Sequence, residues 1–141
     1  AVATWRVKIR NAGNTGISNV TPDYAREYDR SPSRRPEATM ILEMVDIRIR
    51  PGEQAAFDAA IRRGVETVIA KATGFRGYKI NRGVESPDRY VLMIFWDTLE
   101  NHTVDFRGSS AYGEWRAIVS PYFAVPPQIE HFTLVAKSHA P

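Results

Sequence analysis

Six consecutive apolar residues at 91–96 constrain the fold more than any other feature of this sequence. The run reads Val-Leu-Met-Ile-Phe-Trp and is followed by Asp97. Successive side chains of a strand point to opposite sides, so such a run is typical of a β-strand buried on both faces. Helices can cover only one face of a sheet. The other face needs a cover too, and a second copy of the same sheet is the simplest one.

Signals along the chain place this strand third of four. The β-rich segment over residues 40–50 ends at Pro51-Gly52. Apolar residues from Phe57 to Ala72 recur at helical spacing, and Gly74 suits the end of that helix. Asp97 and Glu100 have the spacing of a capping box. The sequence therefore predicts strands over 40–50, 75–84, 89–96 and 128–136 and helices over 53–72, 97–108 and 110–121.

This order, β-α-β-β-α-α-β, is the split βαβ or ferredoxin-like arrangement with its second helix broken in two. It predicts an α+β domain over residues 40–141, with a four-stranded antiparallel sheet and the helices on one face. The apolar second face predicts a homodimer formed through the sheet faces and the C-terminal strand.

Residues 1–39 are expected to be a separate N-terminal extension, because Ser31 to Pro36 holds two prolines and no apolar residue. Within the extension, Trp5, Val7 and Ile9 alternate with basic residues as in a strand. Thr21-Pro22-Asp23 has the character of a helix start. We expect part of this extension to pack on the domain or on a partner subunit.

Charge and composition exclude several classes of function. Residues 1–39 hold seven Lys/Arg and four Asp/Glu, whereas residues 40–141 hold twelve of each, so the net charge of +3 lies in the extension. The domain lacks the concentrated basic face of a nucleic-acid binder. No apolar run approaches the roughly 18 residues of a membrane span. The absence of cysteine excludes disulfides and thiolate sites, and fits a cytoplasmic location.

The segment from Tyr90 to Phe132 resembles the antibiotic-biosynthesis monooxygenase family. The matching features are a strand ending in Trp96, the run Leu99-Glu100-Asn101-His102, the corner Phe106-Arg107-x-Ser109, the run Glu114-Trp115-Arg116, and Pro126-Pro127 before Glu130-His131-Phe132. The resemblance covers roughly residues 40–136. It implies a homodimer whose two sheets close into an α/β barrel, with a pocket in each subunit between sheet and helices. The family includes cofactor-free oxygenases of aromatic polyketides, quinol oxygenases, haem-degrading enzymes and proteins without known activity.

The predicted helix over 97–108 carries two of the three candidate catalytic residues, His102 and Arg107. Leu99, His102 and Phe106 share one helical face, so the imidazole of His102 is expected to point at the pocket and to exchange a proton there. Arg107 and Arg116 are candidates for binding an anionic oxygen. The alternatives are a core histidine bonded to a carbonyl, and arginines paired with Asp105, Glu114 or Glu130.

Candidate substrate-binding residues are Phe106 and two aromatics of the 110–121 helix, Tyr112 and Trp115, which could stack on a flat ligand. Their alternative is packing in the core. Trp96 and His131 are interpreted as structural. The resemblance places His131 on a strand that contributes to the dimer.

Haem and metal cofactors are not expected. Haem-degrading relatives bind iron through a histidine of the helix that here spans 110–120, and Arg116 stands in its place. Their helical tryptophan falls near Phe106, and their first-strand asparagine has no counterpart in 40–50. The histidines His102, His131 and His139 have no i, i+4 pairing. No glycine-rich loop indicates a dinucleotide.

Two hypotheses remain open. The first is a cofactor-independent monooxygenase acting on a small aromatic or quinol substrate, with His102 as the base. The second is a non-catalytic dimeric module, binding a small molecule or related to stress, on the same fold. An open pocket of roughly 300 Å³ or more beside His102 would favour the first. A pocket filled by side chains, with His102 satisfied inside the protein, would favour the second.

Overall fold

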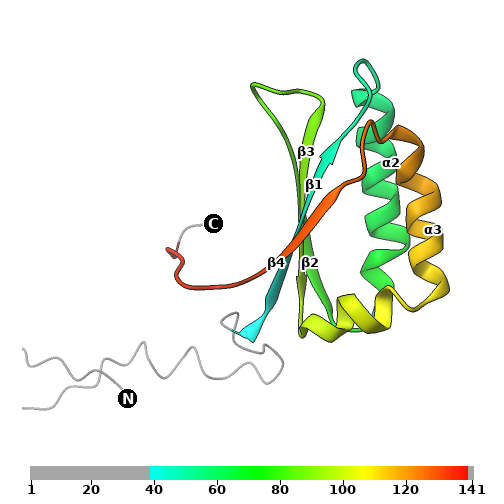
Figure 1. Cartoon of the computed structure of the whole chain (residues 1–141). Helices are drawn as coiled ribbons and strands as arrows, with labels where there is room; N and C mark the ends of the chain where they lie inside the picture. Colours follow the sequence, from blue (N-terminus) through cyan, green and yellow to red (C-terminus); the bar gives the residue numbers. More distant parts are fainter. Residues whose placement is uncertain (1–38, 140–141) are drawn as a thin grey trace, which may run out of the picture. The chain divides into compact units, whose positions relative to one another are not determined.

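Four antiparallel strands form one sheet in the order β2-β3-β1-β4 (Figure 1). The structure is a computed structural model and describes residues 39–139. The strands are β1 (Ile41–Arg48), β2 (Phe75–Arg82), β3 (Arg89–Trp96) and β4 (Gln128–Thr133). The strand order is that of the ferredoxin-like fold, which confirms the predicted class. The predictions for the strand at Trp5 to Ile9 and the helix from Thr21 lie outside the described residues.

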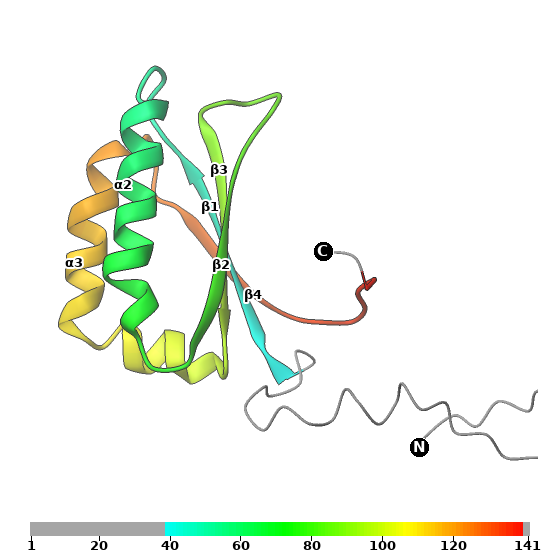
Figure 2. The ribbon, with the colours of Figure 1, turned by 180° about the vertical axis from the view of Figure 1, so that it is seen from behind.

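The helices lie on one face of this sheet, as the two opposite views show (Figures 1 and 2). They are α2 (Gln54–Thr67), the 3₁₀ turn η2 (Ile69–Lys71), the π-helix η3 (Asn101–Phe106), α3 (Ser110–Val119) and the 3₁₀ turn η4 (Ser120–Tyr122). The helix expected over 53–72 is thus shorter. Lys71 and Ala72 donate to carbonyls only three residues back, which tightens the chain after Val68.

Alternating residues of the central strands build the core. Val45 and Ile47 of β1 and the residues from Tyr90 to Trp96 at every second position of β3 are buried. They pack against Phe57, Ile61 and the rest of the apolar face of α2. Burying a side chain of this size contributes about 1.5–3 kcal/mol. One member of the alternation, Glu43, is polar and yet only 4% exposed.

The opposite face of the sheet, here called the outer sheet face, is also apolar at its centre. Met44 lies opposite Met93, and Leu42 lies between Phe95 and Phe132 in the strand register. In the described part of the chain no helix covers this face (Figures 1 and 2). None of the described helices is long and apolar enough to cross a membrane.

Candidate functional site

A buried carboxylate forms the centre of the site. The alternation of β1 turns Glu43 toward the helices, beside the end of β3. Its Oε2 accepts a hydrogen bond of 2.8 Å from the indole nitrogen of Trp96. Its Oε1 lies 3.2 Å from Nε2 of His102. Because burying a carboxyl group is costly without partners, these two contacts make the position tenable.

His102 joins this carboxylate to a second histidine. Strand β4 pairs with β1 so that His131 lies opposite Glu43. Nδ1 of His102 lies 2.7 Å from Nε2 of His131, and the His102 ring stacks on Trp96 with centroids 5.6 Å apart. Both ring nitrogens of His102 are therefore engaged within the protein. The polar groups form a chain from Trp96 through Glu43 and His102 to His131.

The environment shifts the pKa values of all three ionisable groups. Burial raises the pKa of Glu43 to about 7, although the Trp96 hydrogen bond and the charge of Arg107 act in the opposite direction. Burial, then His131 and Arg107, lower the pKa of His102 to about 4. Burial and Arg107 also lower the pKa of His131. A carboxyl group poised near neutral pH beside a neutral imidazole is suited to acid–base chemistry.

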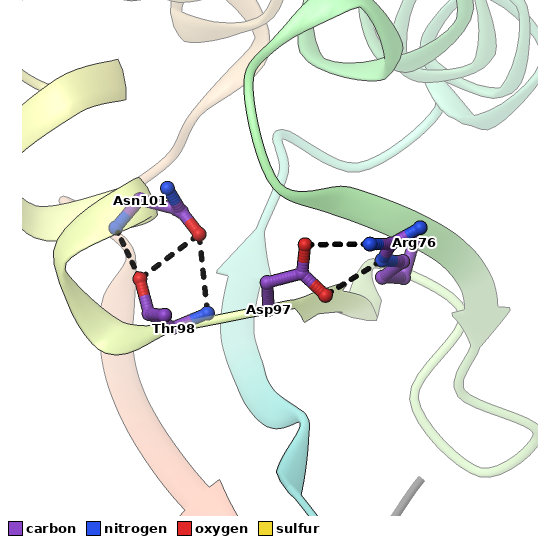
Figure 3. Close-up of polar contacts among 4 residues, drawn as sticks. All are labelled: Arg76, Asp97, Thr98 and Asn101. Atoms are coloured by element: carbon purple, nitrogen blue, oxygen red, sulfur yellow. Dashed lines mark hydrogen bonds and ion pairs between the residues drawn. The ribbon is translucent and has the colours of Figure 1, made fainter. Parts of the chain in front are cut away.

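A capping box fixes the start of the segment that carries His102 (Figure 3). The backbone and hydroxyl of Thr98 both donate to Oδ1 of Asn101, at 3.1 and 2.9 Å, and the Asn101 backbone donates back to the hydroxyl. The box predicted at Asp97 and Glu100 is therefore wrong by one residue. The carboxylate of Asp97 is instead bonded at both oxygens to Arg76 of β2, at 2.7 Å each.

The π-helical winding of η3 decides which residues face inward. The backbone of Arg107 donates to the carbonyl of His102, five residues earlier, at 3.1 Å. His102 and Phe106, four residues apart, are both buried. Leu99 is 40% exposed, so the prediction that it shares their inward face is wrong in the single chain. The wider turn of a π-helix breaks the 3.6-residue spacing on which that prediction rested.

Helix α3 supplies the opposite wall of a small cavity. Trp115 of α3 packs so closely on α2 that a Cβ added to Gly64 would lie 2.8 Å from the indole ring. The whole cavity has a volume of about 40 Å³. Its lining includes Glu43, His102, Phe106, Tyr112, Trp115 and Arg116.

The structure brings five of the six predicted site residues to this cavity. Arg107 is the exception, since it is exposed and does not line the cavity. It acts from outside through its charge on the buried groups. The guanidinium groups of Arg107 and Arg116 lie 5.8 and 5.9 Å from the ring centre of Tyr112. Tyr112 thus connects the two arginines.

The cavity is smaller than the roughly 300 Å³ expected for a site that takes a drug-sized molecule. Its volume of about 40 Å³ has room for a few water molecules or for dioxygen. Within residues 39–139 no group of three or more His, Asp or Glu is arranged to hold a metal ion. Glu43 and His131 meet opposite edges of the His102 ring and do not converge on one point.

Within the polar chain, the sequence predicts a functional role for His102 alone. It predicts structural roles for Trp96 and His131 and assigns no role to Glu43. The available signal was an acidic residue at an inward position of an otherwise apolar alternation, Ile41 to Ile49. An ionisable residue at such a position requires a partner.

Comparison with known proteins gives consistent matches. The model of the antibiotic biosynthesis monooxygenase family matches residues 40–118. The uncharacterized protein YczJ of Bacillus subtilis is 33% identical over 93 residues, which are 66% of this chain and 97% of that protein.

Solved structures agree with this match. A candidate antibiotic biosynthesis monooxygenase from Bordetella bronchiseptica is 39% identical, with a TM-score of 0.66 over 70% of this chain and 99% of its own. A monooxygenase from the gene ActVA-Orf6 of Streptomyces coelicolor, solved in complex with nanaomycin D, is 19% identical. Its TM-score is 0.62 over 74% of this chain and 94% of its own, which establishes a likeness of fold.

Proposed function

The chain belongs to the antibiotic biosynthesis monooxygenase family, and we propose that it is a cofactor-independent monooxygenase acting on a small phenol or quinol. The observation that carries this proposal is the buried pair of Glu43 and His102 at the wall of the cavity. Such a pair can accept a proton near neutral pH while water is kept out.

The chemistry requires little more than deprotonation and shielding. A phenolate is electron-rich and reacts with dioxygen, which adds to a ring carbon. One oxygen atom stays as a new carbonyl, and the other leaves as water with the hydrogen of that carbon and the returned phenolic proton. Phenol and dioxygen thus give quinone and water. The protein supplies the base, the anion partner and an apolar enclosure.

The remaining residues of the cavity have roles in binding. The guanidinium of Arg116 would face the phenolate oxygen, and Trp115 with Tyr112 would stack on the ring. A ring compound fits only if the cavity widens, because its volume in this conformation is about 40 Å³. The Streptomyces structure with bound nanaomycin D provides a precedent for a ligand on this fold.

The assembly and location belong to the same proposal. The apolar outer sheet face supports a homodimer in which two sheets pack face to face. A cytoplasmic location is consistent with a chain that contains no cysteine.

One observation favours the second candidate, a non-catalytic dimeric module. His102 is satisfied at both ring nitrogens inside the protein, and the cavity holds no room for a ring in this conformation. In that case Glu43 and His102 are a structural network, and no substrate is turned over.

Oxygen consumption with a panel of phenols and quinols separates the two candidates. The monooxygenase proposal expects uptake with at least one compound, and expects His102→Ala to remove it while the fold remains. The matched control is His139→Ala, which changes an exposed histidine of the tail. Absence of uptake with the whole panel contradicts the monooxygenase and supports the module.

A further inference from the structure

The contacts of both ring nitrogens leave His102 without a free nitrogen for a ligand. Trp96 carries only a donor, so Oε2 of Glu43 must accept from it. When the carboxyl group is ionised, its Oε1 accepts as well, and the proton of His102 then sits on Nε2. Nδ1 of His102 must in turn accept from Nε2 of His131, at 2.7 Å. Each contact of the chain is thereby assigned one donor and one acceptor.

Glu43 differs from His102 in this respect. A carboxylate has about four lone-pair sites. The hydrogen bond from Trp96 and the 3.2 Å contact with Nε2 of His102 occupy two of them. Glu43 also lines the cavity, together with His102 and Arg116. Of the two residues, the carboxylate is the one with acceptor capacity left for a ligand.

We propose that Glu43 is the catalytic base of this site and that His102 and His131 are positioning residues that orient its carboxylate. This inference rests on the proposed function and names the group that carries it. The ligand O–H bond breaks, its electron pair stays on the ligand oxygen, and the proton forms an O–H bond with Glu43. The proton returns to the oxygen that leaves as water.

The two imidazoles also give the buried carboxyl group a path to the protein exterior. When a proton reaches Nδ1 of His131, its Nε2 proton moves to Nδ1 of His102, and the Nε2 proton of His102 moves to Glu43. The reverse shift releases the proton. His131 is half-buried on β4, an edge strand of the sheet, and so lies at the outer end of this path.

The helical segments and the strand that pack against Glu43 each bring titratable or charged side chains to it. His102 faces it from η3 and His131 from β4, and Arg107 acts on it from the residue after η3. Arg116 and Tyr112 of α3 share the cavity with it. Both arginines stabilise a negative charge in this region. Once the ligand proton has moved to Glu43, that negative charge lies on the ligand oxygen.

A test is to add 3-nitrophenol at about pH 7.5, where this phenol is still mostly neutral in solution and Glu43 is mostly ionised in the protein without ligand. Infrared difference spectra report protonated carboxyl groups, and visible absorption reports the nitrophenolate. To assign the proton to Glu43, the measurement compares the bound phenol in wild type, Glu43→Gln and His102→Gln. The control Glu85→Gln changes an exposed carboxylate in the turn between β2 and β3.

The inference expects a carboxylic acid band and bound phenolate in wild type and in the Glu85→Gln control. His102→Gln, whose amide can still donate to Glu43, should retain both signals, and Glu43→Gln should lose both. Deprotonation that survives in Glu43→Gln but is lost in His102→Gln would make His102 the base and overturn the inference. Nitrophenol that stays neutral, or does not bind wild type, would also overturn it.

Oxygen uptake, measured in parallel, keeps this inference apart from the proposed function. Phenolate formation with the nitrophenol, together with no oxygen uptake from any phenol or quinol of the panel, refutes the monooxygenase and leaves the assignment of Glu43 standing. Where a substrate is found, Glu43→Gln should lower kcat/KM roughly 10²–10⁴-fold. If Glu43→Gln does not fold, the band in wild type and its retention in His102→Gln still decide the assignment.

Discussion

Glu43 and His131 lie directly opposite each other on β1 and β4, yet they are connected through the ring of His102, which contacts one with each nitrogen. The two strands bring the residues to one place, and a separate helix inserts the imidazole. Sheet register and the winding of η3 must therefore both be correct for the site to form.

Opposite pH dependences of stability are expected for variants of Glu43 and His102. The folded pKa of Glu43 is raised from 4.5 to about 7, so this group adds stability as the pH falls through that window. Glu43→Gln lacks this gain. As the pH falls from about 7 toward 4.5, its stability deficit relative to wild type should therefore grow by about 1.4 kcal/mol per pH unit.

The folded pKa of His102 is lowered from 6.5 to about 4, so wild type loses stability as the pH falls through that window. The deficit of His102→Gln should therefore shrink with falling pH, at a similar slope. Denaturant unfolding at several pH values measures both trends. Parallel trends in the two variants would contradict the pKa directions.

Trp96→Phe should raise the pKa of Glu43 further. The indole N–H stabilises the ionised carboxylate, and its loss leaves Oε2 without that donor. The infrared carboxylic acid band should then persist to higher pH than in wild type. A band that disappears at the same or a lower pH would show that the hydrogen bond does not act on the ionised form.

Gly74→Ala should destabilise the protein more than Gly52→Ala. Both glycines have positive φ, at +81° and +87°, so alanine is strained at each by about 1 kcal/mol. Only at position 74 would the new Cβ also collide with the side chain of Asn101, 2.1 Å from its Oδ1. The extra loss of stability measures the contribution of the capping box formed by Asn101 and is expected to be about 1–3 kcal/mol. Equal melting temperatures of the two variants would contradict this role of Asn101.

Met93→Glu should dissociate the proposed homodimer. The side chain lies at the centre of the outer sheet face, opposite Met44, and a buried unpaired charge costs about 3 kcal/mol, or roughly 100-fold in dissociation constant. Val84→Glu is the matched control, because Val84 is 87% exposed at the turn between β2 and β3. Light scattering over a concentration series measures the effect. A stable wild-type monomer at micromolar concentration would refute the dimer.

The fold was predictable because its signals are local and repetitive. The apolar run at 91–96 and the helical spacing from Phe57 place β3 and α2 without any knowledge of tertiary contacts. The ends of these elements are harder to predict from the sequence, because they depend on single hydrogen bonds such as those after Val68.

The site was predictable only in part. His102 and the aromatic wall followed from helical faces and from the family resemblance, whereas Glu43 gains its meaning from the β1–β4 pairing. That pairing joins residues far apart in sequence. The volume of the cavity depends on how Trp115 packs on Gly64, which no spacing pattern encodes.

The π-helical turn of η3 makes the site sensitive to chain length. A π-turn is the equivalent of one residue inserted into an α-helix, and each α-helical residue turns the chain by about 100°. Deleting a single residue between His102 and Phe106 would restore ordinary winding and rotate one of these rings out of the interior. Substitutions at the exposed positions 103–105 keep the count and should be tolerated. In this segment, the number of residues matters more than their identity.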